Sequence, residues 1–248
     1  MSASVIYGFH SIEALVTARP KAIIEVVYTE ERNDQRLQQL LHKLSELHIK
    51  TTPTSKEKIE QFVPEDAAHQ GIMALVRKLE EFGENHLFDI LSSKEQAFFL
   101  ILDGITDPHN LGACLRSAEA AGVDAVIIPK DKSASLTPVA RKISSGASEV
   151  LPVIKVTNLA RTMRKLQDEG VWIVGTAGEA EQNIYQYEFP RRSLALVMGN
   201  EGKGMRRLTR ENCDELVKIP MAGIVSSLNV SVATGVCLFE IVRQLSAK

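Results

Sequence analysis

The sequence predicts an α/β protein: a mainly parallel sheet with helices on both faces, preceded by a small α/β domain. From residue 98 onward, short apolar runs alternate with helical patterns, which is typical of parallel strands joined by helices. A shorter series of strand and helix signals ends before residue 78, and residues 78–96 are charged and mixed, with little periodicity. We therefore expect a small domain over 1–77, a linker over 78–96 and the larger domain over 97–248.

Strand and helix signals alternate within the small domain. Residues 22–28 (AIIEVVY) and 49–52 predict strands, and leucines between residues 37 and 47 recur at helical spacing. Ser55 is placed to cap a helix over 56–62, and residues 71–76 (GIMALV) predict a third strand. In the expected linker, residues 87–91 form a short helical pattern that suits either neighbour.

Six apolar runs mark the strands of the larger domain. They begin at Phe98, Ala125, Val153, Val171, Leu194 and Glu215. In open parallel sheets, ligands bind beyond the carboxyl ends of the strands. The candidate site segments are therefore those that follow four of these runs: 103–110, 176–179, 199–204 and 219–235.

Composition excludes several classes of protein. With 248 residues and 44% hydrophobic content, the chain is long enough to bury a sizeable core. No run approaches the roughly 18 apolar residues of a membrane span, and the first residues do not resemble a signal peptide, so we expect a cytoplasmic protein without membrane contact. The widely spaced Cys114, Cys213 and Cys237 predict reduced thiols, no disulfide framework and no metal site.

The charge balance gives no overall sign of a nucleic-acid-binding protein. The net charge is −2, and neither the first 78 residues nor the rest is strongly basic. Local basic groups remain: Lys203 with Arg206, Arg207 and Arg210, and Arg141 with Lys142. Each group alone is more simply interpreted as a solvated helix face.

Residues 102–123 leave a strand, turn through Asp107 and Pro108, and enter a helix near Asn110. Asn110 and Arg116 do not share a helix face at this spacing, so Asn110 must act from the turn if both point to one ligand. Arg116 has small and apolar sequence neighbours, where a guanidinium needs an anionic partner. A substrate phosphate or an internal ion pair, for example with Glu119 or Glu201, fits equally well.

Three glycines follow the strand that begins at Leu194. Gly199, Gly202 and Gly204 permit positive φ angles and a close approach of backbone to a ligand. A P-loop is excluded, because Gly204 stands where Ser or Thr must follow Lys203. The dinucleotide fingerprint G-x-G-x-x-G is also absent. A nucleotide-like ligand fits this segment, whereas a standard Rossmann cofactor mode does not.

The segment 219–235 ends a strand, breaks at Pro220 and Gly223, and restarts as a helix. We expect its first turns to carry Ser226, Ser227, Asn229 and Ser231. Free N–H groups at a helix start, beside small polar side chains, form a cradle for a polar ligand. The same residues are also ordinary helix caps, and this segment alone does not separate the two.

Taken in order, three motifs resemble those of the SpoU (TrmH-like) class of SPOUT RNA ribose methyltransferases. They are Asn110-Leu-Gly-Ala-Cys-Leu-Arg116, Met198-Gly-Asn-Glu-Gly202, and Ile219-Pro220 with Ser227-Leu-Asn-Val-Ser231. The likeness covers the whole chain. The N-terminal part, with Tyr7-Gly8 and His69-Gln70-Gly71-Ile72, is similar to the small L30e-like RNA substrate-binding domain of the family.

This resemblance implies properties that the residues alone do not. It implies a C-terminal trefoil knot, whereas topology rules predict an ordinary doubly wound sheet. It also implies a homodimer that transfers the methyl group of S-adenosylmethionine to the ribose 2′-OH of a guanosine in large-subunit (23S) rRNA. The RNA partner is then the rRNA itself or a ribosome assembly intermediate. The alternatives are a methyltransferase for another rRNA or tRNA site, and a non-catalytic ribosome-assembly RNA-binding protein.

The resemblance also implies the site residues. The cofactor-binding positions are Thr176, Ala177, Gly178, Gly199, Ile219 and Leu228, and the catalytic set is Asn110, Arg116, Glu201, Ser227 and Asn229. The family's proposed base is the arginine that matches Arg116, but arginine rarely deprotonates in a protein. Our hypothesis is that Arg116 acts as a cation that binds a phosphate and stabilises the developing alkoxide, oriented by Ser227 and Asn229.

Overall fold

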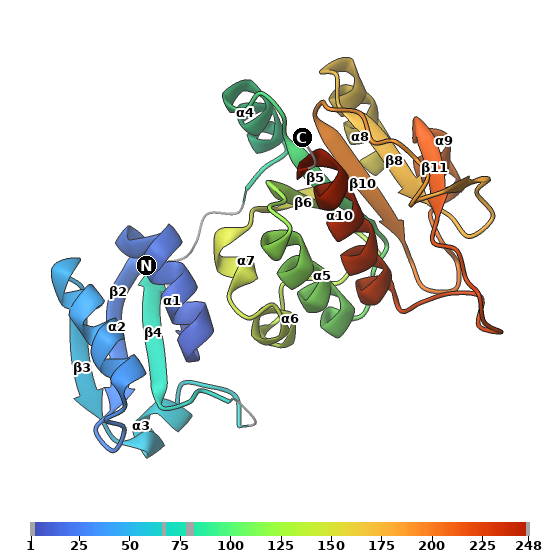
Figure 1. Ribbon diagram of the computed structural model, residues 1–248. Helices are drawn as coiled ribbons and strands as arrows, with labels where there is room; N and C mark the ends of the chain where they lie inside the picture. Colours follow the sequence, from blue (N-terminus) through green and yellow to red (C-terminus); the bar gives the residue numbers. More distant parts are fainter. Residues whose placement is uncertain (1–2, 66–67, 78–81, 247–248) are drawn as a thin grey trace. The chain divides into compact units, whose positions relative to one another are not determined.

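The computed structural model describes residues 3–65, 68–77 and 82–246 of the chain (Figure 1). Its contacts divide it into two compact units. One comprises Met1–Glu80 together with Ser145–Val150, and the other comprises Glu81–Ser144 together with Leu151–Lys248. Within the described ranges, no helix is long and apolar enough to cross a membrane.

The described part of the smaller unit contains a four-stranded sheet in the order β1-β4-β2-β3. β1 (Ala3–Tyr7) and β2 (Ile23–Thr29) pair antiparallel with β4 (Ile72–Arg77), and β3 (Lys50–Thr54) pairs parallel with β2. β2, β3 and β4 are the three predicted strands. β1 was not predicted from the sequence.

Helices cover this sheet and bury its apolar side chains. They are α1 (Phe9–Ala18), the short 3₁₀ helix η1 (Pro20–Ala22), α2 (Gln35–Glu46) and α3 (Lys56–Glu60). α2 buries the predicted leucine stripe through Leu37, Leu40 and Leu44. Ser55 is the N-cap residue of α3, as expected, although its side chain makes no capping hydrogen bond. α7 (Ala147–Val150) lies in Ser145–Val150, the second of the two segments that form this unit.

The described part of the larger unit contains a seven-stranded sheet in the order β7-β6-β5-β10-β8-β11-β9, with parallel pairing throughout. The strands are β5 (Phe98–Asp103), β6 (Ala125–Pro129), β7 (Val153–Val156), β8 (Trp172–Thr176), β9 (Gln182–Asn183), β10 (Leu194–Gly199) and β11 (Glu215–Lys218). The six predicted apolar runs are confirmed as strands. The two-residue β9 lies below the length that a sequence pattern detects.

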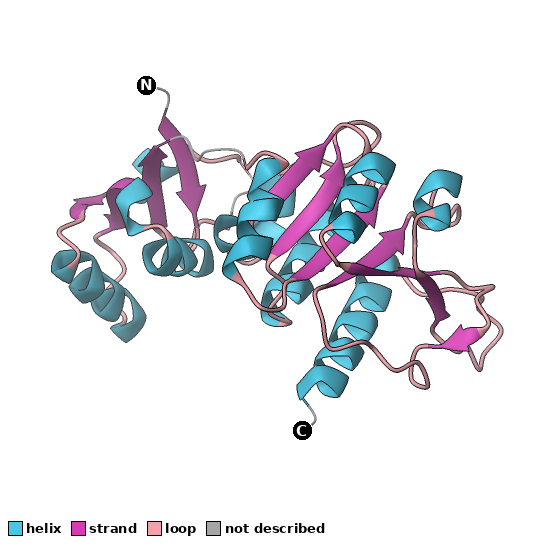
Figure 2. Cartoon of the chain, turned by 90° about the horizontal axis from the view of Figure 1, so that it is seen from above, coloured by secondary structure: helices cyan, strands magenta, loops and turns pink. Residues whose placement is uncertain are grey.

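Helices lie on both faces of this sheet (Figure 2), as predicted. They are α4 (Asn85–Ser93), α5 (Pro108–Ala120), α6 (Pro138–Ile143), α8 (Leu159–Asp168), α9 (Arg207–Glu211) and α10 (Val230–Ser246). Phe99 and Ile101 of β5 share one buried cluster with Leu87 of α4 and Met163 of α8. α4 therefore packs on the larger unit, although it lies inside the segment 78–96 that we expected to be a linker.

The start of α10 corrects one expectation. The helix begins at Val230, so Ser226 and Ser227 lie in the preceding loop rather than in its first turn. Asn229 explains the late start, since its side-chain oxygen accepts hydrogen bonds from the N–H and the hydroxyl of Ser231 at 2.9 and 2.6 Å. The trefoil knot stays a prediction, because strand order alone does not define how the chain threads.

Candidate active site

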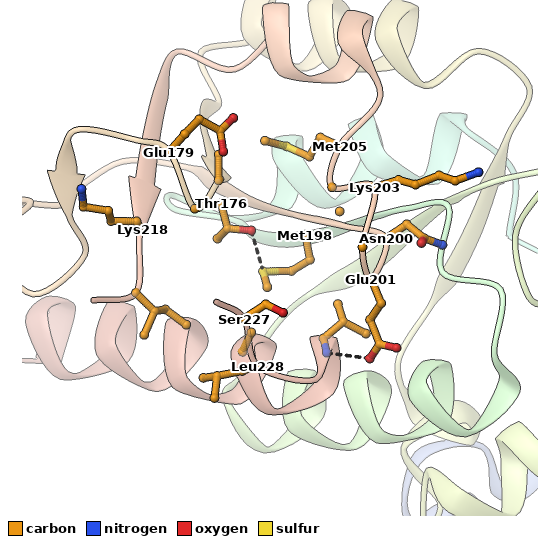
Figure 3. A pocket seen from close by; sticks show the side chains of 18 of the residues that line it. Thr176, Glu179, Met198, Asn200, Glu201, Lys203, Met205, Lys218, Ser227 and Leu228 are labelled. Carbon is orange, nitrogen blue, oxygen red and sulfur yellow. Dashed lines mark hydrogen bonds between the residues drawn. The ribbon is translucent and has the colours of Figure 1, made fainter. Parts of the chain in front are cut away.

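A pocket of about 420 Å³ lies at the carboxyl ends of β8, β10 and β11 (Figure 3). Its wall is formed by the ends of these strands, by the loop 199–205 and by the loop that leads into α10. The structure brings all six expected cofactor-binding residues to this wall: Thr176, Ala177, Gly178, Gly199, Ile219 and Leu228. Residues separated by up to 52 positions in the sequence thus converge, because parallel strands end at one edge of the sheet.

The loop after β10 closes tightly on itself. Asn200 and Gly204 exchange backbone hydrogen bonds of 3.0 and 2.9 Å. A Cβ atom on Gly199 would lie 2.3 Å from the backbone of Gly204 and Met205, so this position requires glycine. The loop is also tied to the end of β5. The buried Asp103 accepts hydrogen bonds from the backbone N–H and the Nε of Arg206, at 2.8 and 2.7 Å.

The opposite wall of the pocket has open space beside its backbone. Ala177 donates its N–H to the carbonyl of Val217 at 3.0 Å, which fixes the chain where it leaves β8. The next residue, Gly178, is different, because a Cβ atom built there meets no heavy atom within 4 Å. Backbone of Gly178 is therefore accessible to a ligand in the pocket.

A polar cluster joins three of the expected catalytic residues. One carboxylate oxygen of Glu201 accepts hydrogen bonds from the amides of Asn110 at 3.2 Å and Asn229 at 2.6 Å, and from the N–H of Val230 at 3.0 Å. The amide of Asn229 also donates to Asn110 at 3.0 Å. Because Val230 opens α10, the carboxylate lies at the positive end of that helix. α5, α10 and the loop after β10 are joined at this point.

Ser227 and Arg116 lie outside that cluster. Ser227 lines the pocket from an exposed loop. Arg116 is exposed in the second half of α5, although its sequence neighbours suggested apolar surroundings. Among the described residues it forms no ion pair, so the internal partner considered from the sequence is absent there. Nothing in the described chain connects Ser227 or Asn229 to Arg116, so the expected orienting contact is absent as well.

Several pocket residues were not singled out from the sequence. Lys218 and Met221 are two of them, and both line the pocket. Arg210, one of the basic residues noted in the sequence, also lines it and forms an ion pair with Glu179. Asp103 does not line the pocket, but its hydrogen bonds to Arg206 hold the loop after β10 in place. The position of Asp103 at a strand end was the available signal, but strand ends often carry acidic residues for structural reasons.

The three cysteines are free, as expected. Burial raises the pKa of Cys114 to about 11, and that of Cys213 and of Cys237 to about 12. These residues therefore remain thiols near neutral pH and offer no thiolate nucleophile. Among the residues described, no group of three His, Cys, Asp or Glu side chains is arranged to hold a metal ion.

Comparison with known proteins gives two adjacent family matches. The model of the SpoU rRNA Methylase family matches residues 97–239, and the model described as RNA 2′-O ribose methyltransferase substrate binding matches residues 5–82. Together they define the class, an RNA methyltransferase that carries a separate substrate-binding domain. The chain belongs to the SpoU rRNA methylase family.

Relatives match the chain almost from end to end. The 23S rRNA (guanosine-2′-O-)-methyltransferase RlmB of Escherichia coli K12 is 56% identical over 242 residues, which are 98% of this chain and 99% of the relative. RlmB of Yersinia pestis is 56% identical over 244 residues, 98% of both chains. Among solved structures, the SpoU methyltransferase AviRb from Streptomyces viridochromogenes has the same fold, with a TM-score of 0.78 at 24% identity over 98% of this chain and 90% of its own.

Proposed function

We propose that this protein transfers the methyl group of S-adenosylmethionine to the ribose 2′-hydroxyl of a guanosine in 23S rRNA. The observation that carries the proposal is the end-to-end identity of 56% with RlmB of Escherichia coli, a 23S rRNA (guanosine-2′-O-)-methyltransferase. The pocket adds independent support, because the motif residues far apart in sequence form its wall. As rRNA is the substrate, we also propose that the protein works in the cytoplasm.

The pocket fits the proposed cofactor in size and chemistry. Its volume of about 420 Å³ lies in the range typical of small-molecule sites, about 300–1,000 Å³. Ile219 and Leu228 offer apolar surface for an adenine ring, and the exposed backbone beside Gly178 offers polar groups. When bound, S-adenosylmethionine supplies a methyl group that is already activated on a sulfonium.

The protein has two remaining tasks: to hold the ribose 2′-oxygen in line with the methyl group, and to favour loss of the hydroxyl proton. Arg116 is permanently charged and has no ion-pair partner among the described residues, so it is available for a phosphate of the RNA and for the developing alkoxide. Asn110, Glu201 and Asn229 bind one another and hold the wall where Ser227 faces the pocket.

A homodimer is the assembly that we propose. α10 exposes Val232 and Phe239, which are 53% and 49% accessible and lie seven residues apart, about two helical turns. Apolar side chains repeated along one exposed helix stripe are typical of a surface that another helix covers. A second copy of the chain is the occupant that the family resemblance favours.

The proposed activity is tested by incubating the protein with labelled S-adenosylmethionine and either unmodified 23S rRNA, an assembled large subunit, or bulk tRNA. We expect label in rRNA only. Label in tRNA would favour the alternative substrate, and RNA binding without label in any RNA would favour a non-catalytic assembly protein. Either result would overturn the proposal.

A further inference from the structure

The smaller unit contains a hollow of about 670 Å³, formed by the end of β2, the start of α3 and residues 68–71. The two segments of this unit that the sequence motifs marked meet beside it. The N–H of Gly8 donates to the carbonyl of Ile72 at 3.2 Å, and the N–H of Phe9 donates to the side-chain oxygen of Gln70 at 3.2 Å. Residues about 60 positions apart in the chain are thus combined in one site.

The turn that borders the hollow has a strained backbone. Gln70 has a φ of 55°, a left-handed conformation that a residue with a side chain rarely adopts. Gly71 follows with a φ of 74°, and a Cβ atom on it would lie 2.6 Å from the hydroxyl oxygen of Thr29. Strain of this kind concentrates at functional sites, where the surrounding structure must hold it in place.

Arg32 presents a fixed planar group to the hollow. Its Nε donates to Asp34, its NH1 donates to the carbonyl of Gln70 at 2.6 Å, and its Cζ lies 4.1 Å from the ring centroid of Phe9. Phe9 is fully buried, so the guanidinium covers it from the solvent side. The Arg32 side chain is nevertheless 30% exposed. The guanidinium is therefore in contact with Phe9 on one side, and part of the Arg32 side chain remains accessible.

The remaining polar groups suit a base edge better than a phosphate. The buried His69 accepts a hydrogen bond at Nδ1 from the N–H of Gly71 at 3.1 Å, and its Nε2 lies 3.9 Å from a carboxylate oxygen of Glu60. The charged side chains of the lining balance, with Arg32 and Lys56 against Glu31 and Glu60. A phosphate site would carry an excess of positive charge.

We propose that this hollow binds one unpaired nucleobase of the RNA substrate, with the base stacked on the guanidinium of Arg32 and its edge facing Glu60 and His69. Proteins that read RNA sequence recognise unpaired bases in this way, by stacking on aromatic rings or guanidinium planes and by hydrogen bonding at the base edges. The inference rests on the proposed function for its RNA, and it names the surface with which the smaller unit contacts that RNA.

The test compares full-length variants in their binding to unmodified 23S rRNA at one fixed salt concentration. Arg32→Lys keeps the charge but removes the planar group, and Arg32→Ala removes both. We expect both to weaken RNA binding about tenfold or more, the range for losing one stacked base, with unchanged affinity for S-adenosylmethionine. Lys21→Ala is the matched control, since Lys21 is exposed at the other end of β2 and should change binding less than about twofold.

A second variant keeps the test decisive if the Arg32 variants lose thermal stability. Ala68→Leu adds bulk to an exposed position of the lining without removing a side-chain contact, and we expect it to weaken RNA binding similarly. Wild-type affinity in Ala68→Leu overturns the proposal. So does wild-type affinity in Arg32→Lys beside weak binding in Arg32→Ala, which indicates a phosphate contact. If the variants weaken RNA binding as expected but the wild-type protein transfers no methyl group, the proposed activity is wrong and this inference still holds.

Discussion

At the scale of single residues, the pocket depends on two glycines in its wall. Gly199 cannot carry a side chain without moving the loop that closes on it, whereas Gly178 borders open space. The two glycines therefore have opposite roles. One allows the wall to form, and the other leaves room beside the wall for a ligand.

Gly178 gives the first prediction. Gly178→Leu should fill the pocket without a clash inside the protein, so we expect unchanged thermal stability and an affinity for S-adenosylmethionine at least about tenfold lower, about 1.4 kcal/mol. Calorimetric titration and thermal unfolding measure the two quantities. Gly83→Leu is the control, because Gly83 also borders open space and lies outside the pocket. Normal cofactor affinity in Gly178→Leu would place the cofactor elsewhere.

Arg116 gives the second prediction. If it acts as a cation, Arg116→Lys keeps near-normal turnover, whereas Arg116→Ala loses about 100-fold or more, the usual cost of removing one group that stabilises developing negative charge. Turnover at saturating RNA is the measurement. Arg164→Ala, an exposed arginine on α8, serves as the control for lost surface charge. Equal inactivity of both Arg116 variants with intact RNA binding would contradict the cation role.

At the scale of elements, α10 is attached near both ends, by the carboxylate of Glu201 at its start and by the amide of Gln244 near its end. Glu201 accepts the N–H of Val230 at its start. Near its end, the largely buried Glu240 accepts hydrogen bonds from Arg243 and from Gln244, and Gln244 also binds the backbone of Tyr187 and Phe189. The second attachment holds the loop 187–189 on the helix.

Glu240 gives a prediction about pH. The hydrogen bond from Arg243 lowers the pKa of Glu240 below its ordinary value of 4.5. A lowered pKa stabilises the fold above the unfolded value, and this stabilisation is lost as the pH falls through the folded value. We expect Glu240→Gln to be less stable than wild type near pH 7, and the difference to shrink below about pH 4.5. Urea unfolding across this pH range, with Glu188→Gln as an exposed control, measures it; a constant difference would exclude the linkage.

Among the elements, the sequence predicts the buried strands well. Apolar runs such as 98–102 and 194–198 identify buried parallel strands, because such strands have no polar face. The start of α10 was misplaced, because serines favour helix caps and loops alike, and only the contacts of Asn229 define the first helical residue. The exposure of Arg116 was also misjudged, since a helix surface depends on which neighbours pack against it.

The candidate site was predicted in part. The motif resemblance named six positions as expected to bind the cofactor, and all six line one pocket. Lys218 was not singled out, and Asp103 was included only as the first residue of the candidate segment 103–110, because their roles depend on contacts between segments distant in the sequence. The hydrogen bonds among Asn110, Glu201 and Asn229 likewise join separate elements and leave no local pattern.

At the scale of the whole molecule, the proposed dimer gives a prediction. Phe239→Glu places a charge on the exposed stripe of α10, and we expect it to shift the protein from a dimer to the 27.3 kDa monomer. Sedimentation equilibrium measures the mass. Leu208→Glu on α9 is a matched control, since Leu208 is 52% exposed and lies on another element. A monomeric wild type, or a dimer that Phe239→Glu does not weaken, would contradict the interface.

The protein, as we propose it, combines an RNA-binding unit with a methyl-transfer pocket for a single ribose of 23S rRNA. The most direct measurement is to map the methylated nucleotide by mass spectrometry after incubating wild-type protein and Gly178→Leu with S-adenosylmethionine and unmodified 23S rRNA. We predict one 2′-O-methylguanosine with wild type and little or none with Gly178→Leu at limiting cofactor. Methylation of a base, methylation of many riboses, or equal modification by both proteins would contradict the account.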